Sequence, residues 1–162
     1  MAPCGAIAVI GGGDANDAVK RLAFAVGRAL AERGATLVCG GLGGVMEAAA
    51  DGAHAAGGFT VGILPGYDRA SANPHIDFAI ATGMGHARNM IVVASGDAVI
   101  AMPGETGTLS EIALALTLRR PVIAIGAWRE IAGVRQAETP AEAVALALEL
   151  SAAGSPKTGS SR

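Results

Sequence analysis

Glu111 stands at the end of a glycine-rich loop, MPGETGTLSE (102–111), which follows the apolar run DAVIAM (97–102) and opens a helix-patterned stretch. A carboxylate in this place could stabilise positive charge that builds on a sugar as its glycosidic bond breaks, or position the attacking water. It could instead close a capping box, in which the Thr108 hydroxyl and the Glu111 carboxylate each accept from the other residue's N–H. The sequence leaves both roles open, and they are compatible, because a capping glutamate faces the same strand end.

Arg88 is the second residue whose type could do chemistry. It lies in GMGHARN (83–89), close to a predicted helix start, where the helix dipole disfavours a cation. It would be better placed facing a carboxylate or a phosphate, to which a guanidinium can donate two parallel hydrogen bonds. A solvated surface arginine is the alternative, because arginine is among the commonest exposed residues.

Glycine-rich segments follow four predicted strands: GGGDAN (11–16), GGLGGVM (40–46), GMGHARN (83–89) and PGETGT (103–108). Glycine lets the backbone approach a ligand closely, and a helix that begins after such a loop directs free N–H groups to the same place. We therefore expect a phosphorylated small molecule as the ligand. In the first loop the candidate binding residues are Gly11, Gly12 and Gly13.

The known phosphate and cofactor fingerprints do not fit these loops. The GxGxxG pattern fails at its third glycine, where Asn16, Met46 and Arg88 stand, and the chain has no GK[ST] segment. The histidines lack metal-ligand spacing, and the two lysines are poorly placed for a Schiff base. We expect neither a metal nor a cofactor.

The elements that would position these loops alternate along the chain. Apolar runs predict strands, and segments with helical periodicity predict helices between them. Strands that are apolar along their whole length are typical of a parallel sheet covered on both faces. The expected fold is a three-layer, Rossmann-like, doubly wound α/β domain with a mainly parallel sheet and helices on both faces. The predicted strands are 6–11, 35–40, 59–64, 76–81, 97–102 and 121–126, and the predicted helices are 14–33, 45–56, 87–94, 108–120 and 141–150.

Composition limits the remaining choices. The 162 residues are 51% hydrophobic and 16% charged with a net charge of -2, which suits one packed domain over residues 1–150, followed by a flexible polar tail over 151–162. No basic cluster marks a nucleic-acid partner, and no apolar run marks a membrane span. The isolated Cys4 and Cys39 indicate buried thiols in a reducing compartment, so we expect a cytoplasmic location.

At GGLGGVMEAAADGAHAAGGFTVGILPG, GHARN and PGETGTLSEIALAL the sequence resembles the superfamily that holds the LONELY GUY phosphoribohydrolases and the molybdenum-cofactor carrier proteins. The resemblance covers roughly residues 5 to 126. It implies a Rossmann-like domain, usually a homodimer or a dimer of dimers, that binds a phosphorylated ligand. The hydrolases release a free base from a nucleoside 5′-monophosphate, whereas the carriers hold the phosphate-bearing pterin of molybdenum cofactor and do no known chemistry.

The resemblance also assigns residues. The catalytic arginine and glutamate of the hydrolases fall on Arg88 and Glu111. Two departures stand out: Glu105 replaces a glycine of the PGGxGT loop, and Asn89 replaces the lysine of HxRK. The ligand-binding residues that it implies, with their neighbours in the two motifs, are Gly40, Gly41, Gly43, Gly44, Val45, Met46, Asn89, Gly104, Thr106, Gly107 and Thr108.

Overall fold

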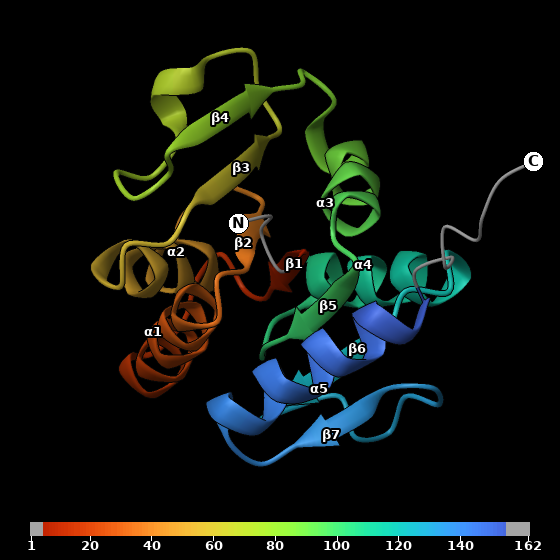
Figure 1. The fold of residues 1–162 in the computed structure, drawn as a ribbon. Coiled ribbons are helices and arrows are strands. Elements are labelled where there is room, and N and C mark those ends of the chain that lie inside the picture. The colour runs from red at the N-terminus through yellow and green to blue at the C-terminus, as the bar shows by residue number, and fades with distance from the viewer. Residues whose placement is uncertain (1–4, 155–162) are drawn as a thin grey trace, which may run out of the picture.

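The computed structural model describes residues 5–154, whose centre is a seven-stranded sheet (Figure 1). The strand order is β4-β3-β2-β1-β5-β6-β7, and every pairing among the described residues is parallel. The predicted mainly parallel, Rossmann-like sheet is therefore confirmed. The strands are β1 (Ala6–Ile10), β2 (Thr36–Cys39), β3 (Thr60–Leu64), β4 (Phe78–Ala81), β5 (Ala98–Ala101), β6 (Val122–Ile125) and β7 (Arg135–Ala137).

Helices cover both faces of this sheet, as predicted. One face packs against α1 (Asp17–Glu32), α2 (Val45–Ala55) and α5 (Pro140–Gly154), and the other against α3 (Asn89–Ser95) and α4 (Thr106–Thr117). Successive residues of β1 alternate between the two cores, with Ile7 in the first and Ala8 in the second. This alternation explains why the central strands are apolar along their whole length.

The connection order creates a crevice beside β1. From β1 the chain moves outward through β2, β3 and β4, then returns to place β5 against the other side of β1 before continuing to β6 and β7. The segments that follow β1 and β5 therefore leave the sheet in opposite directions. In open α/β sheets, ligands bind at this switch point, outside the carboxyl ends of the strands.

Several predicted boundaries need correction. The short edge strand β7 has the sequence RQA, and its polar residues gave no apolar run to detect. Helix α5 continues through Gly154, so the predicted tail begins four residues inside a helix, and residues 155–162 lie outside the described part of the chain. A 3₁₀ turn, η2 (Gly85–Arg88), precedes α3, where the sequence predicted one helix from 87.

The apolar segment 90–94, which follows GHARN, packs mainly against the sheet. Val92 and Val93 are buried in the core on the α3–α4 face, whereas Met90 is exposed. The buried and free Cys39 fits the expected thiol, and Cys4 lies outside the described residues. Over residues 5–154, no helix is both long and apolar enough to cross a membrane.

Candidate functional site

A cleft of about 360 Å³ lies at the switch point, where the segments after β1, β2 and β5 meet the η2–α3 turn. Most of the candidate residues line it together. These are Gly11, Gly12, Gly13, Gly40, Met46, Arg88, Asn89, Thr106, Gly107, Thr108 and Glu111. Five other predicted residues are outside the lining: Gly41, Gly43, Gly44, Val45 and Gly104.

Some of these outer residues hold the loops together. A Cβ on Gly44, whose φ is 64°, would collide with the carbonyl oxygen of Gly12, and a Cβ on Gly104 would collide with the Thr108 hydroxyl. The segments are also joined by backbone hydrogen bonds from Gly12 N to the Pro103 carbonyl (3.0 Å) and from Val45 N to the Gly12 carbonyl (2.9 Å). The glycines at 44 and 104 therefore serve loop packing.

The first turn of α4 presents free N–H groups to the cleft. The helix begins at Thr106, with Glu105 as N-cap. Its first backbone hydrogen bond runs from Leu109 N to the Glu105 carbonyl at 3.0 Å. The N–H groups of Thr106, Gly107 and Thr108 donate to no group among the described residues. A Cβ on Gly107 would meet no atom within 4 Å, so this backbone is open to a ligand.

The capping-box interpretation of Glu111 is wrong. Because α4 starts at Thr106, both Thr108 and Glu111 lie inside the helix, and no side chain caps its N-terminus. Glu111 is only 7% exposed, and its carboxylate accepts no hydrogen bond from the described residues. Burial raises the pKa of Glu111 from 4.5 to about 7, and the nearby charge of Arg88 opposes that rise.

Arg88 is 8% exposed, so the alternative of a solvated surface arginine is also wrong. Its Nε donates to the Ile63 carbonyl at 2.8 Å, and its Nη2 lies 3.5 Å from the Gly40 carbonyl. A Cβ on Gly40 would come within 2.7 Å of Nη2, which explains the glycine there. Burial lowers the pKa of Arg88, and Glu111 opposes that shift, although the two side chains form no ion pair within 4.0 Å.

Asn89 links the arginine to the start of α4. Its Oδ1 accepts from Arg88 Nη1, and its Nδ2 donates to Ser110 Oγ at 3.2 Å. Ser110 Oγ in turn donates to the Gly107 carbonyl at 2.7 Å. A lysine at position 89 has no acceptor and could not accept the hydrogen bond from Arg88, so the departure from HxRK has a positioning consequence.

Sequence reasoning missed several residues of the cleft. Ser110 was not among the predicted site residues, but it connects Asn89 to α4. The cleft is also lined by Val9 and Ile10 of β1 and by Glu105, which the sequence comparison had noted only as a departure from PGGxGT. The remaining lining residues, Asp14, Leu42 and His86, lie within the quoted glycine-rich segments, so these segments were the signal that could have found them.

Metal-ligating side chains do not cluster in the described part of the chain, and the thiol beside the cleft is buried. Among residues 5–154, no group of three or more His, Cys, Asp or Glu side chains could hold a metal ion. Burial raises the pKa of the Cys39 thiol to about 11, so the thiol stays protonated at neutral pH. Its Sγ accepts from Gly41 N at 3.4 Å, which makes it part of the loop support.

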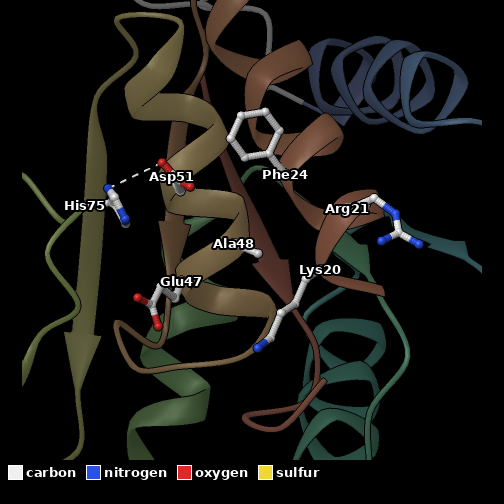
Figure 2. Close-up of a pocket in the computed structure, with 7 residues that line it drawn as sticks. All are labelled: Lys20, Arg21, Phe24, Glu47, Ala48, Asp51 and His75. Atoms are coloured by element: carbon white, nitrogen blue, oxygen red, sulfur yellow. Dashed lines mark ion pairs between the residues drawn. The ribbon is translucent and has the colours of Figure 1, made fainter. Parts of the chain in front are cut away.

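A second hollow, of about 440 Å³, lies between α1 and α2 (Figure 2). Lys20, Arg21 and Phe24 come from α1, and Arg21 points away from α2 in Figure 2. On the other side, Asp51 of α2 lies 3.5 Å from Nδ1 of His75. This groove contains none of the predicted site residues.

The parallel sheet and the glycine-lined cleft at its switch point place the chain among Rossmann-like α/β domains. The model of the SLOG cluster4 family matches residues 5–153, and the chain belongs to this family.

Three proteins with different descriptions are similar to this chain in sequence or in structure. An uncharacterized protein from Archaeoglobus fulgidus is 49% identical over 138 residues, 85% of this chain and 91% of that protein. A cytokinin riboside 5′-monophosphate phosphoribohydrolase from Mycobacterium tuberculosis is 39% identical over 124 residues, 70% of this chain and 66% of the relative. The molybdenum cofactor binding protein from Rippkaea orientalis matches with a TM-score of 0.85 and 38% identity, over 90% of this chain and 96% of that one. The resemblance noted from the sequence motifs is confirmed.

Proposed function

We propose that this protein binds a nucleoside 5′-monophosphate in the cleft and hydrolyses its N-glycosidic bond, releasing a free base and ribose 5-phosphate. The observation that carries the proposal is Glu111: a carboxylate that is buried, without a hydrogen-bond partner among the described residues, and with a pKa of about 7. Buried carboxylates are normally paired, and those with strongly shifted pKa values cluster at functional sites. The phosphoribohydrolase relative supports this reaction class.

The phosphate would bind at the first turn of α4. The free N–H groups of Thr106, Gly107 and Thr108 and the positive end of the helix dipole favour an anion there. Gly107 leaves room for the phosphate oxygens to reach this backbone. The ribose would then extend toward Glu111, one turn further along the same helix.

In the reaction, the bond between C1′ and the base nitrogen breaks, and its electron pair leaves with the base. Glu111 in its ionised form stabilises the positive charge that develops on the ribose and accepts a proton from the attacking water. The water oxygen forms the new bond to C1′, and the departing base takes up a proton. A pKa of about 7 suits a group that must exchange a proton near neutral pH.

Arg88 acts in this proposal as a fixed positive charge that keeps part of the Glu111 population ionised. Its guanidinium is held by the Ile63 carbonyl and by Asn89, which leaves it little freedom to follow a ligand. Asn89 and Ser110 connect that position to the first turn of α4. The charge and the phosphate-binding turn are therefore held by one network.

A panel of nucleoside 5′-monophosphates, adenine types included, tests the proposal when incubated with the purified protein and followed by chromatography. We expect release of free base, and we expect Glu111→Gln to lower the rate by at least about a hundredfold while phosphate binding persists. Equal loss of turnover and binding in that variant, with the fold intact, would show that Glu111 supports the structure only.

A second candidate function is a non-catalytic carrier of molybdenum cofactor. The solved structure of a molybdenum cofactor binding protein matches this chain over nearly the whole length of both chains. A carrier would retain a phosphorylated pterin stoichiometrically and release no base from any nucleotide. Saturable binding of the pterin, without release of base from any nucleotide, would favour the carrier function over the hydrolase function.

We also propose that the protein forms a homodimer through the β4 end of the sheet. Phe78 and Ile80 of β4 are 49% and 40% exposed, and they pair in register with Val61 and Ile63 of β3, on the face that α3 and α4 cover elsewhere. Parallel sheets are normally buried on both faces. Sedimentation equilibrium of wild type and Phe78→Glu tests this: the wild type should be dimeric and the variant monomeric.

A further inference from the structure

The phosphate end of the cleft contains a negative charge of its own. Glu105 lines the cleft and occupies the N-cap position of α4, immediately before the free N–H groups. Its side chain accepts no hydrogen bond from these N–H groups, so the groups remain free to bind a ligand. It is exposed, and no arginine or lysine among the described residues forms an ion pair with it.

The other charges of the cleft do not compensate for Glu105. Among the described residues that line the cleft, Arg88 is the only arginine or lysine, whereas Asp14, Glu105 and Glu111 carry carboxylates. Three of the Arg88 N–H groups already point to protein acceptors. An anion at the start of α4 is therefore attracted by backbone N–H groups and repelled by a nearby carboxylate.

We propose that Glu105 tunes the phosphate site by reducing the advantage that a doubly charged terminal phosphate, as in the proposed nucleoside 5′-monophosphate substrate, would otherwise have over a phosphate with one negative charge, such as a phosphodiester. The helix N-terminus attracts an anion as about half a positive elementary charge would, whereas the Glu105 carboxylate carries a full negative charge. Repulsion by Glu105 therefore disfavours a doubly charged phosphate more than a singly charged one. This inference rests on the proposed phosphate site and refines the class of ligand that it accepts.

The test compares two ligands at pH 8, where a phosphate monoester is doubly charged: adenosine 5′-monophosphate and its singly charged methyl phosphodiester. Calorimetry in the Glu111→Gln background prevents turnover and removes the Glu111 charge from the comparison. Without further change, the monoester should have little advantage over the diester. Adding Glu105→Gln should shift the preference toward the monoester by about fivefold.

Controls separate charge from loop shape. Glu105→Gly should shift the preference as Glu105→Gln does; a shift with glycine alone would attribute the effect to loop geometry and overturn the proposal. Glu149→Gln, which removes one exposed charge from α5 on the opposite face, should leave the ratio unchanged. An unchanged ratio in Glu105→Gln overturns the specificity role alone, whereas no binding of either ligand by any variant overturns the phosphate site with it.

Discussion

The cleft at the switch point and the groove between α1 and α2 have similar volumes, about 360 and 440 Å³, but their ionisable side chains differ in burial. In the groove, the side chains of His75 and Asp51 are 28% and 47% exposed and can exchange their contact for water. In the cleft, Arg88 and Glu111 are buried, and each shifts the pKa of the other.

The difference between the two hollows lies in the burial of charge rather than in size, and it is on this ground that we propose the cleft as the functional site. A solvated ion pair contributes little free energy and imposes little geometry. A buried carboxylate without a partner has a free-energy cost in the folded protein, which a ligand or a reaction can recover. Each of the following changes tests whether the two hollows differ in this way.

The largest effect is expected from Arg88→Ala. This change removes hydrogen bonds to the Ile63 carbonyl and to Asn89, and it leaves Glu111 buried without the opposing charge. We expect the free energy of unfolding to fall by about 3 kcal/mol and turnover to fall by at least about a hundredfold. Urea denaturation and the base-release assay measure the two effects.

Arg28→Ala is the matched control, because Arg28 is 61% exposed and pairs with Glu32 of the same helix at 2.9 Å. It should cost at most about 0.5 kcal/mol and leave turnover unchanged. Similar costs for the two arginines would mean that the buried position of Arg88 has no energetic consequence.

Much of the fold and the position of the cleft could be predicted from the sequence, because both follow from local sequence patterns. The apolar runs predicted six of the strands, and the glycine-rich segments predicted that the cleft lies at the carboxyl ends of these strands. The role of Glu111 could not be decided, since the capping box requires Thr108 to be the N-cap of α4, whereas the N-cap is Glu105. A shift of three residues moves Glu111 from the first turn of the helix into the second.

The hydrogen-bond partners were also beyond sequence reasoning. Arg88 contacts the Ile63 carbonyl, 25 positions away, and Asn89 contacts Ser110, 21 positions away. Such contacts depend on how the strands are ordered in the sheet, which motifs do not encode. The groove between α1 and α2 was missed for the same reason, because its lining comes from three separate segments.

The next effect concerns pH and the buried carboxylate of Glu111. Its pKa is 4.5 ordinarily and about 7 in the folded protein, so between these values the folded chain binds more protons than the unfolded chain. The contribution of this group to stability is therefore complete below about pH 4.5 and is lost as the pH rises to about 7, amounting to roughly 3 kcal/mol.

Glutamine stays neutral, so Glu111→Gln should remove this loss. Urea denaturation of both proteins from pH 4.5 to 8 should show the difference between them growing across that window and then staying constant. Parallel pH profiles would indicate that Glu111 ionises in the folded protein as it does in water.

A smaller effect is expected from Gly107→Ala at the phosphate-binding turn. Alanine favours a helix by about 1 kcal/mol over glycine, and its Cβ meets no protein atom within 4 Å, so the fold should be retained or stabilised. The same methyl group would occupy space next to the free N–H groups. We expect phosphate-ligand affinity to fall by about tenfold or more, measured by calorimetry.

Gly66→Ala provides the control, because a Cβ there also meets nothing within 4 Å but lies outside the cleft. Affinity should not change in that variant. Unaltered binding in Gly107→Ala would place the phosphate elsewhere in the cleft.

The smallest effect is expected from Asp51→Asn in the groove between α1 and α2. The change removes the carboxylate that lies 3.5 Å from His75, but both side chains remain open to solvent. A Cβ on Gly27 or Gly52 would collide with the backbone of the facing helix, so α1 and α2 pack backbone to backbone beneath the groove, independently of its charges. We expect a change of at most about 0.5 kcal/mol in the free energy of unfolding and none in ligand affinity. A loss of affinity comparable to that of Gly107→Ala would show that the exposed groove takes part in binding, and burial of charge would then fail as the mark of function in this fold.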